Sequence, residues 1–268
     1  MLVDTHAHLQ SREFDRDRDV VIHRAMSAGV RAIINVGFDL ETSQRALKLA
    51  QIEGMYATCG IHPHNAKHMT LWAAEVEQLI PSERLVAVGE IGLDYYRNLS
   101  APEAQKECFA RMIDLARRVR LPIVVHDRDA HKDILAMLKS EKAEQVGGVM
   151  HCFSGDWQMA RDCLDMGFFI SIAGPVTFKN SSRLQQVAAS VPLDRLLIET
   201  DCPYLAPEPY RGMRCEPGMV RLVAERVASL RGESPESIQE ATWQNAIRLF
   251  GLDKEQVLCA ANIPKQPE

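Results

Sequence analysis

The chain has 268 residues, of which 46% are hydrophobic and 25% charged, and it carries a net charge of −5 at pH 7. A chain of this length can bury a large core, and it fits one α/β barrel as well as it fits two domains. We expect one domain. The acidic balance argues against a surface coated with basic residues for nucleic-acid binding. A phosphate-bearing substrate would therefore have to be held by metal ions and a local basic cluster.

The cysteines and the N-terminus indicate the compartment. Seven cysteines without CxxC pairs do not form a disulfide framework in a chain of this size, and they suit a reducing cytosol. The N-terminus lacks the basic, apolar and cleavage segments of a signal peptide, and no apolar run is long enough to span a bilayer. We expect a cytoplasmic protein with no membrane association and no obligate protein partner.

Strand-like and helix-like segments alternate from the first residue. An apolar stretch ending at His8 predicts a buried strand, and Gly29 marks the end of the helix after it. Asp39 is the expected N-cap of the next helix, which Gly54 should stop. The first half reads as strand 1–8, helix 15–28, strand 31–36, helix 39–53, strand 55–60, helix 71–80 and strand 85–92.

The second half continues the same rhythm. Ser100 and Glu103 predict a capping box, with Pro102 in the first turn of a helix to residue 119. The pattern then reads as strand 122–126, helix 130–139, strand 148–151, helix 157–166, strand 168–172, helix 183–189, strand 196–201 and helix 216–230. Ser234 predicts the cap of one more helix, ending near residue 250. We expect a single (β/α)₈ TIM barrel with an extra C-terminal helix over residues 1–252, followed by a tail at 253–268.

Metal-binding side chains recur where the predicted strands end. His6 and His8 are one residue apart, so alternation along a strand places both on one face. The remaining candidates each end a later strand: Glu90, His126, His151 and Asp201. Any one of these alone is more often a structural, hydrogen-bonded residue. Agreement among five strand ends instead favours two adjacent divalent-metal sites, since a carboxylate can bridge two ions.

Five motifs around these residues are familiar: D-T-H-A-H at 4–8, G-I-H-P-H at 60–64, G-E-I-G-L-D-Y-Y at 89–96, H-C-F-S-G at 151–155 and E-T-D-C-P at 199–203. Their order and spacing resemble the TatD family of metal-dependent deoxyribonucleases, amidohydrolase-like TIM barrels, over the chain to about Leu252. The resemblance implies hydrolysis of DNA phosphodiesters, commonly with Mg²⁺, as a 3′-to-5′ exonuclease or at damaged sites. It also implies the metal ligands His6, His8, Glu90, His126, His151 and Asp201. One departure is Cys215, where the family pattern has asparagine, and this leaves the specificity of the last loop open.

The candidate ligands suggest roles in catalysis. Two metals would orient the phosphate and acidify a shared water, with Glu90 as the bridge. Asp201 is the candidate for accepting the proton of that water, although a role purely as ligand has equal weight. His62 could donate a hydrogen bond to the phosphate or the leaving group, or it could stiffen the loop beside Pro63. Asp4 and Glu199 are expected to accept hydrogen bonds that fix the histidine tautomers.

Charged and aromatic residues follow the later strands. Four cations could bind flanking phosphates, or they could be solvated surface charges: Arg97, Lys179, Arg211 and Arg214. Four aromatic residues could stack on unpaired bases, although rings near a barrel rim more often pack: Tyr95, Tyr96, Phe153 and Tyr204. Cys152 and Cys202 flank candidate ligands, but strand alternation turns them away from the metals.

The leading hypothesis is a two-metal phosphodiesterase acting on DNA at single-stranded ends. An alternative is an amidohydrolase-like hydrolase of a small amide, lactone or phosphoester. Many such barrels bridge their metals through a carboxylated lysine on the fourth strand, where this chain has Glu90. A third reading, a metal-binding scaffold without catalysis, does not explain why all six ligand positions are intact. The mixture of imidazole and carboxylate admits Mg²⁺, Mn²⁺ or Zn²⁺.

Overall fold

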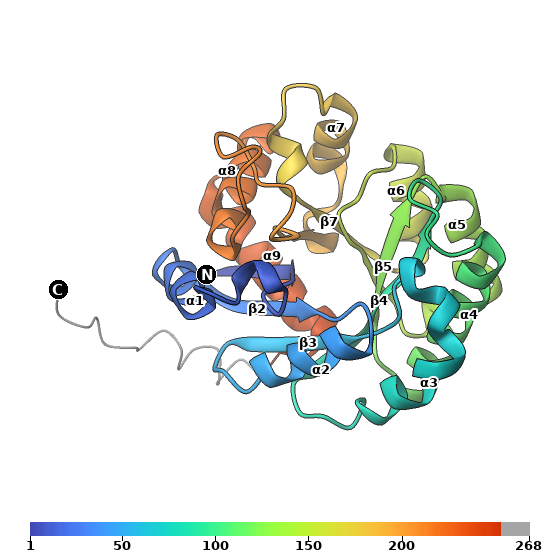
Figure 1. The fold of residues 1–268 in the computed structure, drawn as a ribbon. Helices are drawn as coiled ribbons and strands as arrows, with labels where there is room; N and C mark the ends of the chain where they lie inside the picture. Colours follow the sequence, from blue (N-terminus) through green and yellow to red (C-terminus); the bar gives the residue numbers. More distant parts are fainter. Residues whose placement is uncertain (253–268) are drawn as a thin grey trace.

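The computed structural model describes residues 1–252, so the expected tail at 253–268 lies outside the described residues. Eight parallel strands follow one another in chain order, each hydrogen-bonded to the next, and the helices lie around them (Figure 1). A bridge between Ala7 and Cys202 joins the first strand to the segment after the eighth, which nearly closes the barrel. The predicted TIM barrel is confirmed.

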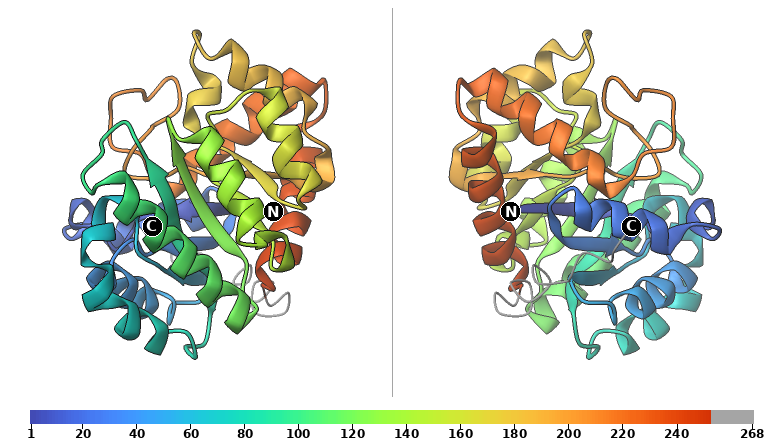
Figure 2. Two further views of the ribbon diagram at one scale, coloured as in Figure 1. Left: turned by 90° about the vertical axis from the view of Figure 1, so that its right-hand side faces the viewer. Right: turned by 90° about the vertical axis from the view of Figure 1, so that its left-hand side faces the viewer.

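The strands lie close to their predicted positions. Their bounds are β1 (Leu2–Ala7), β2 (Val30–Val36), β3 (Met55–Cys59), β4 (Leu85–Asp94), β5 (Ile123–Arg128), β6 (Gly148–Met150), β7 (Phe169–Ile172) and β8 (Leu196–Ile198). The long strands β4 and β5 lie side by side (Figure 2). The prediction that β8 continues to Asp201 was wrong, because the chain turns there toward β1. The amide of Asp201 donates to the carbonyl oxygen of His6 at 2.9 Å, and its φ is 56°.

The helices are also found where expected, usually with shorter ends. They are α1 (Arg18–Ser27), α2 (Leu40–Leu49), α3 (Met69–Gln78), α4 (Pro102–Val119), α5 (His131–Ser140), α6 (Trp157–Asp165), α7 (Ser182–Ser190), α8 (Val220–Arg231) and α9 (Pro235–Phe250). Short 3₁₀ turns are η1 (Arg12–Phe14), η2 (Pro63–His68), η3 (Ala143–Gln145), η4 (Gly174–Thr177), η5 (Leu193–Arg195) and η6 (Pro217–Met219). None of the described helices is long and apolar enough to cross a bilayer.

Two of the three predicted helix caps are confirmed. The side chains of Asp39 and Ser234 accept the backbone amides three residues onward, at 2.7 and 3.1 Å. The predicted capping box at Ser100 was wrong, because Ala101 occupies the cap position without a side-chain bond. The Ser100 hydroxyl instead donates to the carbonyl oxygen of His64 at 2.9 Å, so it holds the loop after β3 against the start of α4.

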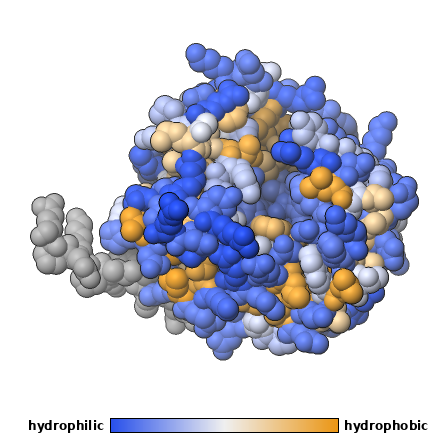
Figure 3. Space-filling model, viewed as in Figure 1, coloured by the Kyte–Doolittle hydropathy of each residue, from blue (hydrophilic) through white to orange (hydrophobic). Residues whose placement is uncertain are grey.

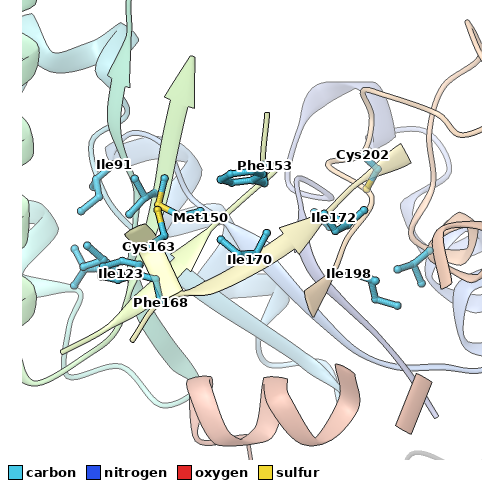
Figure 4. Packing of buried hydrophobic residues seen from close by; sticks show 14 of the residues in the cluster. Ile91, Ile123, Met150, Phe153, Cys163, Phe168, Ile170, Ile172, Ile198 and Cys202 are labelled. Carbon is cyan, nitrogen blue, oxygen red and sulfur yellow. The ribbon is translucent and has the colours of Figure 1, made fainter. Parts of the chain in front are cut away.

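The hydrophobic core has two parts. The larger part fills the space between strands and helices, and Figure 4 shows its packing around β7, with Ile170 close to Phe153. The smaller part occupies the barrel interior, where Val124 and Leu197 meet Trp243 and Phe250 of α9. The extra C-terminal helix thus closes the barrel at the end where β1 begins. The polar side chains described next lie at the opposite end, where catalytic groups of TIM barrels are found.

Candidate metal centre

The first group of donor atoms forms where β1 and the turn after β8 meet. The Nε2 atoms of His6 and His8 are 3.2 Å apart, and both side chains are buried. Oε2 of Glu90 lies 3.5 Å from Nε2 of His6, and Oδ1 of Asp201 lies 3.4 Å from Nε2 of His8. Ligands bound at about 2.0–2.1 Å in a tetrahedron are themselves about 3.4 Å apart. The nitrogens of His6 and His8 and the oxygen of Glu90 therefore fit a single divalent cation, and Asp201 lies beside His8.

The second group surrounds the other oxygen of Glu90. Oε1 lies 2.7 Å from Nδ1 of His126 and 2.9 Å from Nε2 of His151, and these two nitrogens are 3.4 Å apart. Each carboxylate oxygen of Glu90 thus faces its own set of imidazole nitrogens. This is the arrangement that a carboxylate bridging two cations requires. The structure brings all six sequence-predicted ligands together at one end of the barrel.

The position of Glu90 depends on the glycines around it. A Cβ atom at Gly92 would overlap the carbonyl oxygen of His126, and the φ of Gly92, +143°, also favours glycine. A Cβ at Gly89 would come within 2.6 Å of the Val124 Cβ atom. The G-E-I-G sequence therefore lets β4 approach β5 closely, which brings the Glu90 carboxylate against His126.

Hydrogen bonds on the far side of three rings fix which nitrogen faces the centre. Nδ1 of His8 donates to the carbonyl oxygen of Val36 at 2.8 Å, and Nδ1 of His151 donates to Oε1 of Glu199 at 3.3 Å. Glu199 thus accepts from an imidazole as expected, but it also forms, with His6 and His151, a group of three donors that could hold a metal ion, so a ligand role for Glu199 stays open. Nε2 of His126 lies 3.4 Å from Oδ2 of Asp94. Sequence reasoning missed Asp94, although it stands in the G-E-I-G-L-D-Y-Y motif and continues the strand that carries Glu90.

The expectation for Asp4 was wrong. Its carboxylate accepts hydrogen bonds from the backbone amide and the hydroxyl of Thr200, not from an imidazole. The pairing of β1 with β2 is irregular in the same stretch, between Asp4 and Ala7. Burial raises the pKa of Asp4 to about 8, against the opposing effect of the Thr200 hydrogen bonds. Asp4 thus joins β1 to the turn after β8.

The electrostatics of the centre favour cations. Burial alone would raise the pKa of Glu90, but the neighbouring imidazoles, His151 first, hold that pKa well below its usual value. Burial likewise opposes ionisation of Asp201, whose pKa is nevertheless lowered by the hydrogen bond from His8 and the nearby histidine charges. In turn, the charges of Glu90 and Glu199 outweigh burial and raise the pKa of His151. Two ionised carboxylates among imidazole nitrogens, one buried and one half-buried, make a strong site for divalent cations.

His62 lies beside the second donor group. Burial lowers its pKa to about 4, so its ring is neutral near pH 7. Its Nδ1 atom accepts the amide hydrogen of His64 at 3.1 Å, which places the ring proton on Nε2. That Nε2 lies 3.4 Å from Oε1 of Glu90. In this tautomer His62 presents an N–H donor to the centre, which agrees better with a hydrogen-bonding role than with a ligand role.

The residues predicted to bind substrate differ in exposure and in whether their charges are already paired. Tyr204 is 54% exposed, with its ring centroid 6.4 Å from that of His8. Arg97 and Lys179 are exposed, and the guanidinium of Arg211 stacks 4.3 Å from the Phe178 ring. Arg214 is engaged instead, because its guanidinium donates to both carboxylate oxygens of Asp17, at 2.9 and 2.6 Å, and to Glu216.

Other flanking residues belong mainly to the packing. Phe153 is buried, and the hydroxyl of Tyr95 donates to Asp133 at 2.7 Å. Cys215 is buried with its thiol 3.9 Å from the carbonyl oxygen of Thr200, so it packs beneath the Asp201 turn. No cysteine belongs to the donor groups among residues 1–252. Cys202 belongs to the larger part of the core, between strands and helices, which agrees with the prediction that its side chain points away from the metals.

An open cleft is lined in part by residues 152–154, which directly follow His151 in the chain. It has a volume of about 450 Å³ and lies between residues 152–154 and 180–184, with Asn180 and Arg183 among its lining residues. Figure 3 shows one face of the molecule that is hollowed near its middle and surrounded mainly by hydrophilic residues. The cleft has room for a group larger than water, and its lining begins one residue after His151.

The fold and the donor groups together define a metal-dependent hydrolase built on a TIM barrel. A family model described as TatD related DNase matches residues 3–251. The chain belongs to the TatD family, and the predicted resemblance is confirmed.

Relatives with known names cover nearly the whole chain. Uncharacterized metal-dependent hydrolase YabD from Bacillus subtilis is 47% identical over 94% of this chain and 100% of its own length. The 3'-5' ssDNA/RNA exonuclease TatD from Klebsiella pneumoniae is 37% identical over 94% of this chain and 98% of its own. The crystal structure of the TatD homolog YJJV from Escherichia coli is 31% identical, with a TM-score of 0.89 over 94% of this chain and 98% of that one.

Proposed function

We propose that this protein is a cytoplasmic two-metal phosphodiesterase that shortens DNA from single-stranded 3′ ends. The observation that carries the proposal is the placement of Glu90, whose two carboxylate oxygens face two separate groups of imidazole nitrogens. Paired sites of this kind suit in-line displacement at phosphorus, where attacking and leaving oxygens need stabilisation together. The name of the Klebsiella pneumoniae relative supports the same substrate class.

Two divalent ions, Mg²⁺ in activity or alternatively Mn²⁺ or Zn²⁺, would offset the phosphate charge and acidify the attacking water when bound. The ligands would be His6, His8, Glu90, His126, His151 and Asp201. Asp201 is ionised, because its pKa lies below the usual value, and its Oδ1 is thus available to accept a proton. His62 directs its N–H into the centre and would donate to the phosphate or the leaving oxygen.

The flanking phosphates need cations that are not already paired. We assign this role to Arg97, Lys179 and Arg211, with Tyr204 offering an exposed ring beside the centre for an unpaired base. Arg214 does not join this set, because binding a phosphate would require it to leave Asp17 and Glu216. Its bonds instead tie the last loop to the segment before α1.

The decisive experiment incubates single-stranded DNA, labelled at either end, with purified protein and each of Mg²⁺, Mn²⁺ and Zn²⁺. A 5′-labelled strand should give a ladder of shortened products, while a 3′-labelled strand should release labelled mononucleotide from the start. Glu90→Gln serves as the inactive control. Absence of cleavage with every metal would contradict the proposal. Turnover of a small amide, lactone or phosphoester would then identify the alternative hydrolase, and metal binding without any turnover would identify a scaffold.

A further inference from the structure

Arg128 ends strand β5 at the same end of the barrel as the metal centre, and sequence analysis did not select it. It follows the ligand His126 by two residues, so the two side chains leave the strand on the same face. The separation along the strand is about 7 Å. Arg128 is exposed, whereas the donor groups are almost entirely buried. Its side chain therefore stands just outside the centre, where a bound strand would enter or leave.

The guanidinium of Arg128 is held on one face and free at its edge. Its Cζ atom lies 4.3 Å from the ring centroid of Tyr96, a residue in the loop after β4 that is 61% exposed. The Arg97 guanidinium lies near the same ring, with its Cζ atom 5.9 Å away. Within residues 1–252, the N–H groups of Arg128 form neither a hydrogen bond nor an ion pair. A stacked guanidinium with free donors is pre-organised for a bidentate phosphate contact.

Nearby carboxylates do not neutralise this arginine. The Asp127 carboxylate accepts from Nδ1 of His131 at 2.8 Å, and Asp94 is occupied by His64 and His126. Arg214 differs in this respect, because its N–H groups are paired with Asp17 and Glu216. Arg211 repeats the arrangement of Arg128 in the loop after β8, where it stacks on Phe178. Arg128 at the end of β5 and Arg211 in the loop after β8 are thus both stacked on aromatic rings.

We propose that Arg128, backed by Tyr96, binds a phosphate that flanks the scissile one in a nucleic-acid strand. This inference rests on the proposed function, and it deepens it by giving a residue that distinguishes a strand from a small diester. A small diester has no flanking phosphate, so it needs only the metal centre. A strand that spans the rim also gains the Arg128 contact, and its binding should therefore depend on this side chain.

The test compares wild type, Arg128→Ala and Arg128→Lys on single-stranded DNA and on bis(p-nitrophenyl) phosphate, with metal present. Arg111→Ala, at an exposed position on α4, is the matched control. We expect Arg128→Ala to raise the KM for DNA about tenfold or more, because a charge-assisted hydrogen bond is lost. The slope of log KM against log salt should fall by about 0.7, the value for one single-strand phosphate contact. Lysine should restore the slope but only part of the affinity, and the KM for the small diester should not change.

A set of strands with one neutral methylphosphonate at successive linkages identifies the contact. At one flanking position, the neutral linkage should raise the KM of the wild-type protein about as much as Arg128→Ala raises the KM for unmodified DNA. The KM of Arg128→Ala should not change when that same linkage is made neutral. Equal losses on DNA and the small diester, or an unchanged KM and salt slope for DNA, would overturn the inference while leaving the proposed function intact. If wild type cleaves neither substrate, the proposed function itself fails.

Discussion

Nδ1 of His126 lies 2.7 Å from Oε1 of Glu90, while the opposite ring nitrogen lies 3.4 Å from Oδ2 of Asp94. The imidazole is therefore held between a carboxylate that faces the metal centre and one that lies behind it. The same Asp94 oxygen is 2.7 Å from Nε2 of His64. One buried carboxylate thus orients two histidines and sets which nitrogen of His126 is available to a metal.

Asp94→Asn should weaken metal binding without unfolding the protein. The amide can still accept the backbone hydrogen of Arg97, which Oδ1 now accepts at 2.7 Å. Its NH₂ group cannot accept a hydrogen bond from His126, so the ring loses its orientation. We expect the affinity of the second donor group to fall about 10- to 100-fold, measured by competition with a chelating dye. Asp133→Asn, on the exposed ion pair with Lys106, is the control, and an unchanged affinity in Asp94→Asn would refute the assignment.

Glu90→Gln should reduce the number of bound ions from two per chain to one or none. The neutral amide replaces an ionised carboxylate that faces both donor groups, and it cannot offer an anionic oxygen to each. Elemental analysis of the saturated, desalted protein measures the stoichiometry, and Glu103→Gln on the surface of α4 provides a matched charge change. Two ions retained by Glu90→Gln would show that Glu90 is not the bridge.

Metal binding should also stabilise the fold. An ion that binds only the native state at about 100 times its dissociation constant contributes about 2.7 kcal/mol. For a chain of this size that corresponds to a rise in Tm of roughly 5–10 °C. Differential scanning calorimetry with a chelator and after metal addition measures the shift. The shift should be smaller in Glu90→Gln, and equal shifts in the two proteins would place the stabilising ion elsewhere.

Asp201→Asn should separate the two roles of this residue. If Asp201 accepts the proton of the attacking water, turnover of DNA should fall by at least ~10²-fold while the metal content is retained. Stopped-time assays at saturating substrate, together with elemental analysis of the same sample, give both quantities. A loss of activity that only parallels a loss of metal would leave Asp201 as a ligand, and near-normal turnover would remove it from the mechanism.

Trp243→Ala should destabilise the barrel without touching the centre. Trp243 is 2% exposed and packs with Phe250 and the barrel-interior residues at the end opposite the donor groups. The lost burial and the resulting cavity should cost about 3–5 kcal/mol of unfolding free energy. Urea denaturation measures the loss, with the exposed neighbour Gln244→Ala as control. An unchanged unfolding midpoint would show that α9 does not contribute to the barrel core.

The sequence alone predicted the barrel, which is confirmed, and the six candidate donor residues, which the structure brings together at one end of it. The β/α rhythm is local, because apolar periodicity, helix caps and glycine stops are written within each segment. His6 and His8 lie at the end of β1, and parallel strands in a barrel bring their carboxyl ends to one rim. Glu90 was expected at the end of its strand, but β4 continues four residues beyond it, to Asp94. For this reason the ligands could be listed before their distances were known.

Only the tertiary structure decided which partners the remaining side chains have. Ser100 bonds to the loop after β3 instead of capping its own helix, and Asp4 accepts hydrogen bonds from Thr200, 196 residues further along the chain. Arg214 is taken by Asp17, while Arg128 stacks on Tyr96 and keeps its donors free. Each of these contacts joins residues from different segments of the chain. Local patterns fix which face a residue occupies, but the neighbour across that face is set by how the strands and loops pack.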